Sequence, residues 1–361
     1  MTVAQTIVRS LLAAYTVAAA VSILEAQPAS TWQSQTSGVT DRLRGVSAVS
    51  SQVAWASGAR GTVLRTTDGG QHWQRLPVPG ADALDFRDVD AMSDRVAYAL
   101  SIGSGESSRI YKTTDGGAHW TLQFANHDPG VFLDAMTFRD ASHGVAFSDS
   151  VDGRFVIFTT ADGRTWDRVP AERLPPALPG EGAFAASGTN VAMSGDRHVW
   201  IGTTASRVLR SSDGGRTWTV VPTPLATGKA TGIFSIAFRD ADHGVVVGGN
   251  YEKESQAVDN AVVTSDGGAT WTLVAEHGLS GFRSVVSWVP WAKESLVAIG
   301  PSGADWSSDD GRSWKPFEAT GFDTLSVAPK GGVAWAAGQG GRISKLTPTA
   351  SPAFDVPVSG R

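Results

Sequence analysis

A short motif that recurs six times constrains the fold of this 361-residue chain more than any other feature. Each copy has a small hydroxyl residue, an Asp, one or two Gly and a closing Trp. The copies are TTDGGQHW at 66–73, TTDGGAHW at 113–120, the shorter TADGRTW at 160–166, SSDGGRTW at 211–218, TSDGGATW at 264–271 and SSDDGRSW at 307–314. Recurrence at this period indicates a repeat architecture, in which each repeat is one supersecondary unit.

The residues of the motif are suited to stabilising a turn. The Asp of each copy is expected to accept hydrogen bonds from backbone N–H groups of its own turn, and the glycines permit a positive φ. The Trp that follows is expected to bury its ring between neighbouring units. We therefore interpret the motif as the mark of a β-hairpin and not of a site. Its residues are Asp68, Asp115, Asp162, Asp213, Asp266, Asp309, Trp73, Trp120, Trp166, Trp218, Trp271 and Trp314.

The spacing of the motif matches the size of a propeller blade. Successive motif Trp residues are 47, 46, 52, 53 and 43 positions apart, and the chain between them alternates apolar and polar residues in four short runs. The 41 Gly and 13 Trp fit many tight turns and large buried rings. A solenoid is the competing repeat architecture, but it would need capping units, whereas the two ends of this chain complete one unit.

Two leftover segments predict how the ring closes. After Trp314 the chain holds three strand-like runs without a fourth, and STWQSQ around Trp32 is a fourth strand without a unit. Joining them hides sheet edges that would otherwise be open. We predict an all-β, seven-bladed β-propeller with four-stranded blades, whose last blade is closed by an N-terminal strand. The propeller is expected at 27–346, followed by a C-terminal tail at 347–361.

The first 26 residues are typical of an export signal. Arg9 precedes an apolar run of 14 residues, Leu11–Leu24, which is short for a membrane span. We expect a signal peptide at 1–26 and a periplasmic or secreted protein; an uncleaved N-terminal anchor is the alternative. The absence of Cys excludes thiol catalysis and Cys-ligated metals, and no metal or cofactor is expected. A net charge of -5 without a basic block argues against nucleic-acid binding.

The turns into the innermost strands suggest a site at one mouth of the central channel. Aligned by register, LRGV, FRDV, FRSV and FDTL give blades 1, 2, 6 and 7 the residues Arg44, Arg87, Arg283 and Asp323. The same alignment gives blades 3 and 5 Leu133 and Ile233, which predicts an apolar opposite wall. One interpretation is an arginine crown that binds a carboxylate or phosphate. The other is that the arginines pair with Asp85, Asp88 and Asp323 at the channel edge.

Two loops and one repeated turn are further candidates. The Pro-rich loop 174–184 could carry Glu181 toward the channel. The charged insertion 250–260 in blade 5 is either a solvated excursion or a partner-contact loop. Asp140 with His143, repeated as Asp240 with His243, could suggest metal or acid–base chemistry, but their repetition favours turn stabilisation.

With the motifs and unit order established, the chain resembles the photosystem II stability and assembly factor-like family of Asp-box (BNR) propellers, in its bacterial branch outside photosynthesis. The resemblance runs through the unit LRGVSAVSSQVAWASGARGTVLRTTDGGQHW and its copies, and includes EGAFAASG. It implies a protein-binding role as an assembly or stability factor, with a membrane-protein assembly intermediate as one kind of partner. We expect the protein to be non-catalytic and monomeric. An anionic or carbohydrate ligand is the other class considered.

Asp-box propellers also include sialidases and other glycosidases, so a carbohydrate-active hydrolase at the channel mouth is the alternative function. A sialidase-like site needs three Arg, a Tyr with a Glu partner and an Asp, and Tyr98, Tyr111 and Tyr251 are expected in outer strands or the blade 5 loop. An inverting enzyme needs two facing carboxylates. The candidates are Asp85, Asp88, Asp134, Glu181 and Asp323, and no spacing selects a pair.

Overall fold

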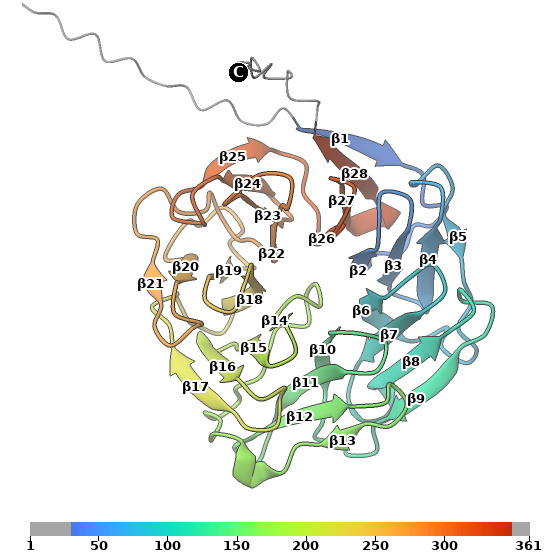
Figure 1. The fold of residues 1–361 in the computed structure, drawn as a ribbon, viewed down its shortest axis with the longest axis horizontal. Coiled ribbons are helices and arrows are strands. Elements are labelled where there is room, and N and C mark those ends of the chain that lie inside the picture. The colour runs from blue at the N-terminus through green and yellow to red at the C-terminus, as the bar shows by residue number, and fades with distance from the viewer. Residues whose placement is uncertain (1–29, 349–361) are drawn as a thin grey trace, which may run out of the picture.

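Seven antiparallel sheets of four strands each are arranged in a ring in the computed structural model, which describes residues 30–348 (Figure 1). Blade 1 contains β2 (Leu43–Ala48), β3 (Ala54–Gly58), β4 (Thr62–Thr66) and β5 (Gln74–Arg75). Blade 2 contains β6 (Asp85–Ala91), β7 (Ala97–Ile102), β8 (Arg109–Thr113) and β9 (Thr121–Ala125). Blade 3 contains β10 (Leu133–Phe138), β11 (Gly144–Val151), β12 (Arg154–Thr160) and β13 (Asp167–Arg168).

The remaining blades repeat this order. Blade 4 contains β14 (Val191–Ser194), β15 (His198–Gly202), β16 (Arg207–Ser211) and β17 (Thr219–Pro222). Blade 5 contains β18 (Thr231–Phe238), β19 (Gly244–Asn250), β20 (Ala261–Thr264) and β21 (Thr272–Leu273). Blade 6 contains β22 (Val285–Trp288), β23 (Leu296–Gly300), β24 (Gly303–Ser307) and β25 (Lys315–Glu318). Short 3-10 turns lie at η1 (Gly105–Ser107), η2 (Ala171–Arg173) and η3 (Gln339–Gly341).

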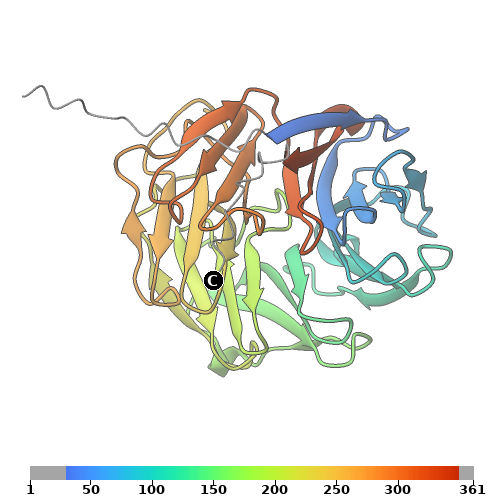
Figure 2. The same ribbon diagram turned by 45° about the horizontal axis from the view of Figure 1, so that its top comes forward.

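Blade 7 joins the two ends of the described chain, as predicted. It contains β26 (Thr324–Val327), β27 (Ala334–Ala337), β28 (Ile343–Pro348) and, as its outer strand, β1 (Ser30–Gln35). β1 and β28 pair along their whole length, with Trp32 opposite Leu346 (Figure 2). The propeller therefore extends to Pro348, two residues past the expected boundary. The expected signal peptide at 1–26 and the tail beyond Pro348 lie outside the described residues, and residues 30–348 contain no helix long and apolar enough to cross a bilayer.

The motif turns are closed by their own side chains. Thr66 Oγ1 donates to Asp68 Oδ1 (2.9 Å), and that oxygen accepts the backbone N–H of His72 (3.0 Å). Thr66 Oγ1 also accepts the N–H of Gly70, which has a φ of +90°. The equivalent bond from the His119 N–H lowers the pKa of Asp115 to about 2. These contacts keep the carboxylates ionised and inside their own turns, away from the channel.

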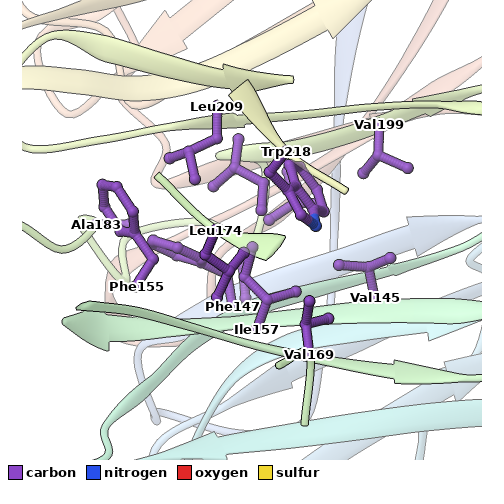
Figure 3. Packing of buried hydrophobic residues seen from close by; sticks show 13 residues of the cluster. Val145, Phe147, Phe155, Ile157, Val169, Leu174, Ala183, Val199, Leu209 and Trp218 are labelled. Carbon is purple, nitrogen blue, oxygen red and sulfur yellow. The ribbon is translucent and has the colours of Figure 1, made fainter. Parts of the chain in front are cut away.

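The motif Trp rings lie between the blades. Trp218 packs between blades 3 and 4, against residues that include Phe147, Ile157 and Val199, and its Nε1 donates to the Gly215 carbonyl (2.9 Å) (Figure 3). Each of the other five motif Trp residues belongs to a different inter-blade cluster, and Trp32 belongs to the cluster between blades 6 and 7. Burial of one such ring contributes about 2–3 kcal/mol. The six motif Trp residues and Trp32 thus provide one anchor for each of the seven blade interfaces.

Polar side chains join the innermost strands of neighbouring blades. Ser326 Oγ accepts the Ala48 N–H (3.0 Å), and Ser235 Oγ accepts the Val286 N–H (3.0 Å). Between blades 2 and 3 two carboxylates take this role. Asp88 Oδ2 accepts the Met136 N–H (2.7 Å), and Asp90 Oδ2 accepts the Phe138 N–H (2.8 Å).

Asp90 makes the stability of the propeller depend on pH. Burial raises its pKa from 3.8 to about 6, despite the hydrogen bond from Phe138. Because the folded state binds the proton more tightly than the unfolded chain, stability falls as pH rises through about 4 to 6. Asn at this position keeps the acceptor without the charge. We expect Asp90→Asn to raise the free energy of unfolding at pH 8 by about 1–2 kcal/mol, allowing for the partial exposure of the group.

Urea unfolding at pH 4 and pH 8 checks this expectation. The gain should disappear at pH 4, where Asp90 is mostly protonated in the wild type. Asp94→Asn, an exposed neutralisation in the same blade, is the control and should change stability little at either pH. A variant that is no more stable than the wild type at pH 8 would contradict the burial argument.

Candidate functional site

Six of the seven blades present one residue, on or just before the innermost strand, to a common mouth of the channel. In β2, β6, β10 and β18 this residue lies at a β-bulge, where the register with the next strand shifts by one. The bulged residues are Arg44, Arg87, Asp134 and Phe234. In blades 6 and 7 the equivalent residues are Ser284 and Asp323, immediately before the paired Val285 and Thr324. All six line one cavity of about 600 Å³.

The register expected from sequence is one residue out in blades 3, 5 and 6. Leu133 and Ile233 are completely buried, and the mouth positions belong to their neighbours Asp134 and Phe234. Since strand side chains alternate between faces, a slip of one residue turns a side chain away from the site. The apolar wall expected opposite the arginines is therefore wrong in blade 3, where the residue is acidic, whereas in blade 5 the wall is apolar but is formed by the aromatic ring of Phe234.

Arg283 is not brought to the mouth. Its side chain is 2% exposed, and Nε donates to Asp305 Oδ2 (2.7 Å) while Nη2 donates to Ser280 Oγ (2.6 Å). Burial lowers its pKa, and the charge of Asp305 opposes that shift. Arg283 thus holds blade 6 together, and the expected crown of three arginines loses this member.

Arg87 and Asp323 lie at the mouth and are paired there. Arg87 Nε donates to Asp85 Oδ2 (2.8 Å). Asp323 accepts a bidentate pair from Arg42, with Nε–Oδ2 at 2.9 Å and Nη2–Oδ1 at 2.6 Å. Arg42 was not singled out, although it stands two positions before Arg44 in DRLRGV, the spacing of one strand face. Asp88, the third carboxylate expected to pair with an arginine, instead binds the backbone of blade 3.

Arg44 is the arginine of the cavity without a carboxylate partner among the described residues. Its single hydrogen bond there is from Nη1 to the Ala186 carbonyl (3.4 Å), and its buried Nε has no acceptor. Burial, together with the nearby positive charge of Arg87, lowers the pKa of Arg44 to about 10. The guanidinium still carries its charge at neutral pH and has donors to spare.

The floor of the cavity is a chain segment that crosses the channel. Residues 182–190, here called the plug, precede β14 and reach into the ring (Figure 1). The Ala185 carbonyl accepts Arg87 Nη1 (2.7 Å), and Ser187 Oγ donates to the Ser284 carbonyl (2.9 Å). Gly188 has a φ of +73°, and a Cβ there would lie 2.3 Å from an oxygen of Asp88, so only Gly fits. The EGAFAASG stretch thus closes the channel with its own backbone.

Glu181 is held just before the plug and does not reach the cavity. Its carboxylate is buried against the guanidinium of Arg207, and it accepts Thr203 Oγ1 (2.7 Å) and the Leu178 N–H (2.8 Å). These bonds tie the Pro-rich loop to blade 4. Glu181 therefore positions the start of the plug and is not a member of the mouth.

The blade 5 insertion at 250–260 lies at the mouth. The Glu254 carbonyl accepts the Phe282 N–H (2.8 Å), which docks the loop on blade 6. The Tyr251 ring stands edge-on to Phe184 and Phe234, with centroids 6.0 Å apart in each case. Both Tyr251 and Glu254 line the cavity. Sequence alone left this loop open between two interpretations, and only its docking places it at the site.

The repeated Asp–His turns form no site with the residues described. Asp140 Oδ1 accepts the N–H groups of Ser142 (2.8 Å) and His143 (3.0 Å), and the same pattern recurs at Asp240. The hydrogen bond to the His143 side chain is the main reason why the pKa of Asp140 lies well below its usual range. Across residues 30–348 no group of three or more His, Asp or Glu is placed to hold a metal ion.

The fold and the cavity define a class: a seven-bladed β-propeller whose channel is plugged and whose one mouth holds a ligand-sized, charged and aromatic cavity. No family model matches the chain, and no curated protein matches it.

Among solved structures, the fold is similar to that of YCF48 bound to D1 peptide (16% identity, TM-score 0.61, covering 90% of this chain and 98% of that chain). It is also similar to YCF48 from Cyanidioschyzon merolae (16% identity, TM-score 0.61, 88% and 99%). The GH74 enzyme of Niastella koreensis matches at 14% identity and a TM-score of 0.58, covering 87% of this chain and 53% of that one. This chain therefore has a YCF48-like propeller fold.

Proposed function

We propose that this chain is a non-catalytic propeller that binds a protein partner at the plugged mouth and acts as an assembly or stability factor. The observation that carries the proposal is Arg44, a partly buried cation with unused donors in a cavity of about 600 Å³. Burying a charge without a partner costs free energy, and a carboxylate of the partner would supply the missing acceptor in the planar geometry that guanidinium favours. Arg42 and Arg87 also line the cavity, but each is already paired with a carboxylate.

One of the fold neighbours supports a peptide ligand. One of them is YCF48 in a complex with a D1 peptide, and the same fold here presents a cavity wide enough for a few side chains. We further propose that the chain belongs to the bacterial, non-photosynthetic branch of Asp-box propellers. In this proposal it works as an exported monomer in the periplasm or outside the cell, and its partner is a membrane-protein assembly intermediate.

Affinity capture tests the proposed function. The tagged, exported protein is used to recover partners from native membrane and periplasmic fractions, with Arg44→Gln as the test variant. Loss of one charge-assisted contact is worth about 1.5–3 kcal/mol, so recovery of a specific partner should fall about 10-fold or more. Arg95→Gln is the matched control, because Arg95 is exposed in the turn between β6 and β7, at the other end of β6 from the mouth. A partner captured equally well by Arg44→Gln would refute the assigned site.

A sialidase-like hydrolase is the second candidate, since the cavity also contains Tyr251 with Glu254, three arginines and three Asp. Two observations make the hydrolase the second candidate. No hydrogen bond joins Tyr251 to Glu254 in the described chain, and two of the three arginines are already paired with carboxylates. We expect no release of 4-methylumbelliferone from its sialoside; release that is abolished by Tyr251→Phe would reverse this order.

A further inference from the structure

The cavity has an acidic pole that the arginines do not neutralise. Asp134 on β10 and Asp149 on β11 both line it. Asp134 is 1% exposed, and neither of its carboxyl oxygens has a hydrogen-bond partner. Among residues 30–348, neither carboxyl takes part in an ion pair. A buried carboxyl without any donor is rare in folded proteins and costs free energy.

The plug places the two carboxyls together. The Ala183 N–H lies against both and donates to Asp149 Oδ1 (3.3 Å). A Cβ on Gly182 would lie 1.6 Å from the same oxygen, so Asp149 packs directly on bare plug backbone. Burial raises the pKa of Asp134 and of Asp149, and the neighbouring charge of Asp149 adds to the shift at Asp134. The protein therefore holds two carboxyl groups at a position where burial disfavours the ionised form of both.

An aromatic wall lies in the same cavity. Phe184 of the plug stacks on Phe234 with centroids 4.0 Å apart and planes 5° apart, and Phe282 meets Phe234 edge to face at 4.6 Å. Such a wall packs against the aliphatic stem of a long basic side chain and attracts its cationic head. An anionic ligand alone would leave this half of the cavity unused.

We propose that Asp134 and Asp149 form a cation-accepting subsite that takes a Lys or Arg side chain of the partner. This inference rests on the proposed function, because the same partner segment would place a carboxylate on Arg44. The cavity then recognises a dipolar segment: a carboxylate against blade 1, a cationic head against blade 3, and the stem between them against the rings of Phe184 and Phe234. The cationic head supplies the donors that Asp134 lacks.

Titration calorimetry on the full chain with two short peptides tests the subsite. The probes are acetyl-Ala-Lys and acetyl-Ala-norleucine, both with a free terminal carboxylate, which differ only in the ammonium group. We expect the Lys peptide to bind at least about 10-fold more tightly to the wild type. Asp134→Asn, and separately Asp149→Asn, should reduce this preference to within about 2-fold while leaving the norleucine peptide unaffected. Arg44→Gln should weaken both peptides alike.

The outcomes separate the two proposals. Equal binding of the two peptides by the wild type, or a Lys preference that survives both Asn variants, overturns the subsite and leaves the Arg44 site standing. Binding of neither peptide overturns both. Asn matches Asp in shape, and Asp134 donates and accepts nothing in the described structure, so the Asn variant should melt no lower than the wild type. The peptide comparison therefore measures charge and not loss of fold.

Discussion

Replacing Arg283 with Ala is expected to destabilise the propeller by about 3–5 kcal/mol, although the same change at Arg44 should affect stability little. Arg283 is almost completely buried, and its Nε–H is the donor to Asp305 Oδ2. Asp305 is itself fully buried, with Oδ1 unpartnered. Without the guanidinium, the Asp305 carboxylate remains in the interior of blade 6 without the opposite charge and the hydrogen bond that Arg283 supplies.

Urea unfolding of Arg283→Ala, followed by tryptophan fluorescence, measures this loss. The double variant Arg283→Met with Asp305→Leu is the control, because removing both charges avoids the uncompensated carboxylate and should recover most of the lost stability. A single variant that loses less than about 1 kcal/mol would show that Arg283 is not structural. Until this is measured, Arg283 should be left out of any set of binding-site variants, because an unfolded variant would imitate loss of binding.

Removal of β1 is the second change with a large expected effect. A chain that begins at residue 37 leaves β28 as an open edge and takes the Trp32 ring away from Phe322, whose centroid lies 5.1 Å from it. Loss of the ring alone is worth about 3 kcal/mol or more. We expect the shortened protein to lose its cooperative unfolding transition or to associate through the exposed edge.

Urea unfolding and size-exclusion chromatography distinguish these results from a neutral truncation. The control begins at residue 30, which keeps β1 and should unfold like the full chain. Trp32→Ala in the full chain separates the contribution of the ring from that of strand pairing. If the chain from residue 37 were monomeric and as stable as the control, ring closure by β1 would contribute nothing to stability.

The fold could be predicted almost completely from sequence because the information is repeated. Six motifs at spacings of 43 to 53 residues fix the blade size, and the unmatched run around Trp32 identifies the strand that closes blade 7. The site could be predicted only in part, because its position depends on single-residue register. Bulges at Arg44, Arg87, Asp134 and Phe234 shift the alternation of side chains between the two sheet faces by one residue. A short apolar run contains no sequence signal for such a bulge.

Contacts between distant segments account for the other misses. Tyr251 reaches the cavity only because the Glu254 carbonyl docks its loop on blade 6. Glu181 stays out of the cavity because Arg207, 26 positions later, takes its carboxylate. Neither pairing has a local signature. Of the four residues that the aligned turns placed at the mouth, Arg44, Arg87 and Asp323 line the cavity, whereas Arg283, taken from the similar turn FRSV, does not.

The plug changes how a local disturbance is transmitted between the blades of this ring. In a propeller with an empty channel each blade contacts its two neighbours, and a disturbance has to travel around the ring one interface at a time, as in a linear repeat array. The plug enters from blade 4 and binds Arg44 of blade 1, Arg87 of blade 2, Ser284 of blade 6 and Thr324 of blade 7. These connections link blades that are not adjacent. A ligand seated on the plug is therefore in one-step contact with most of the ring, and its binding should slow hydrogen exchange in distant blades as well as at the mouth.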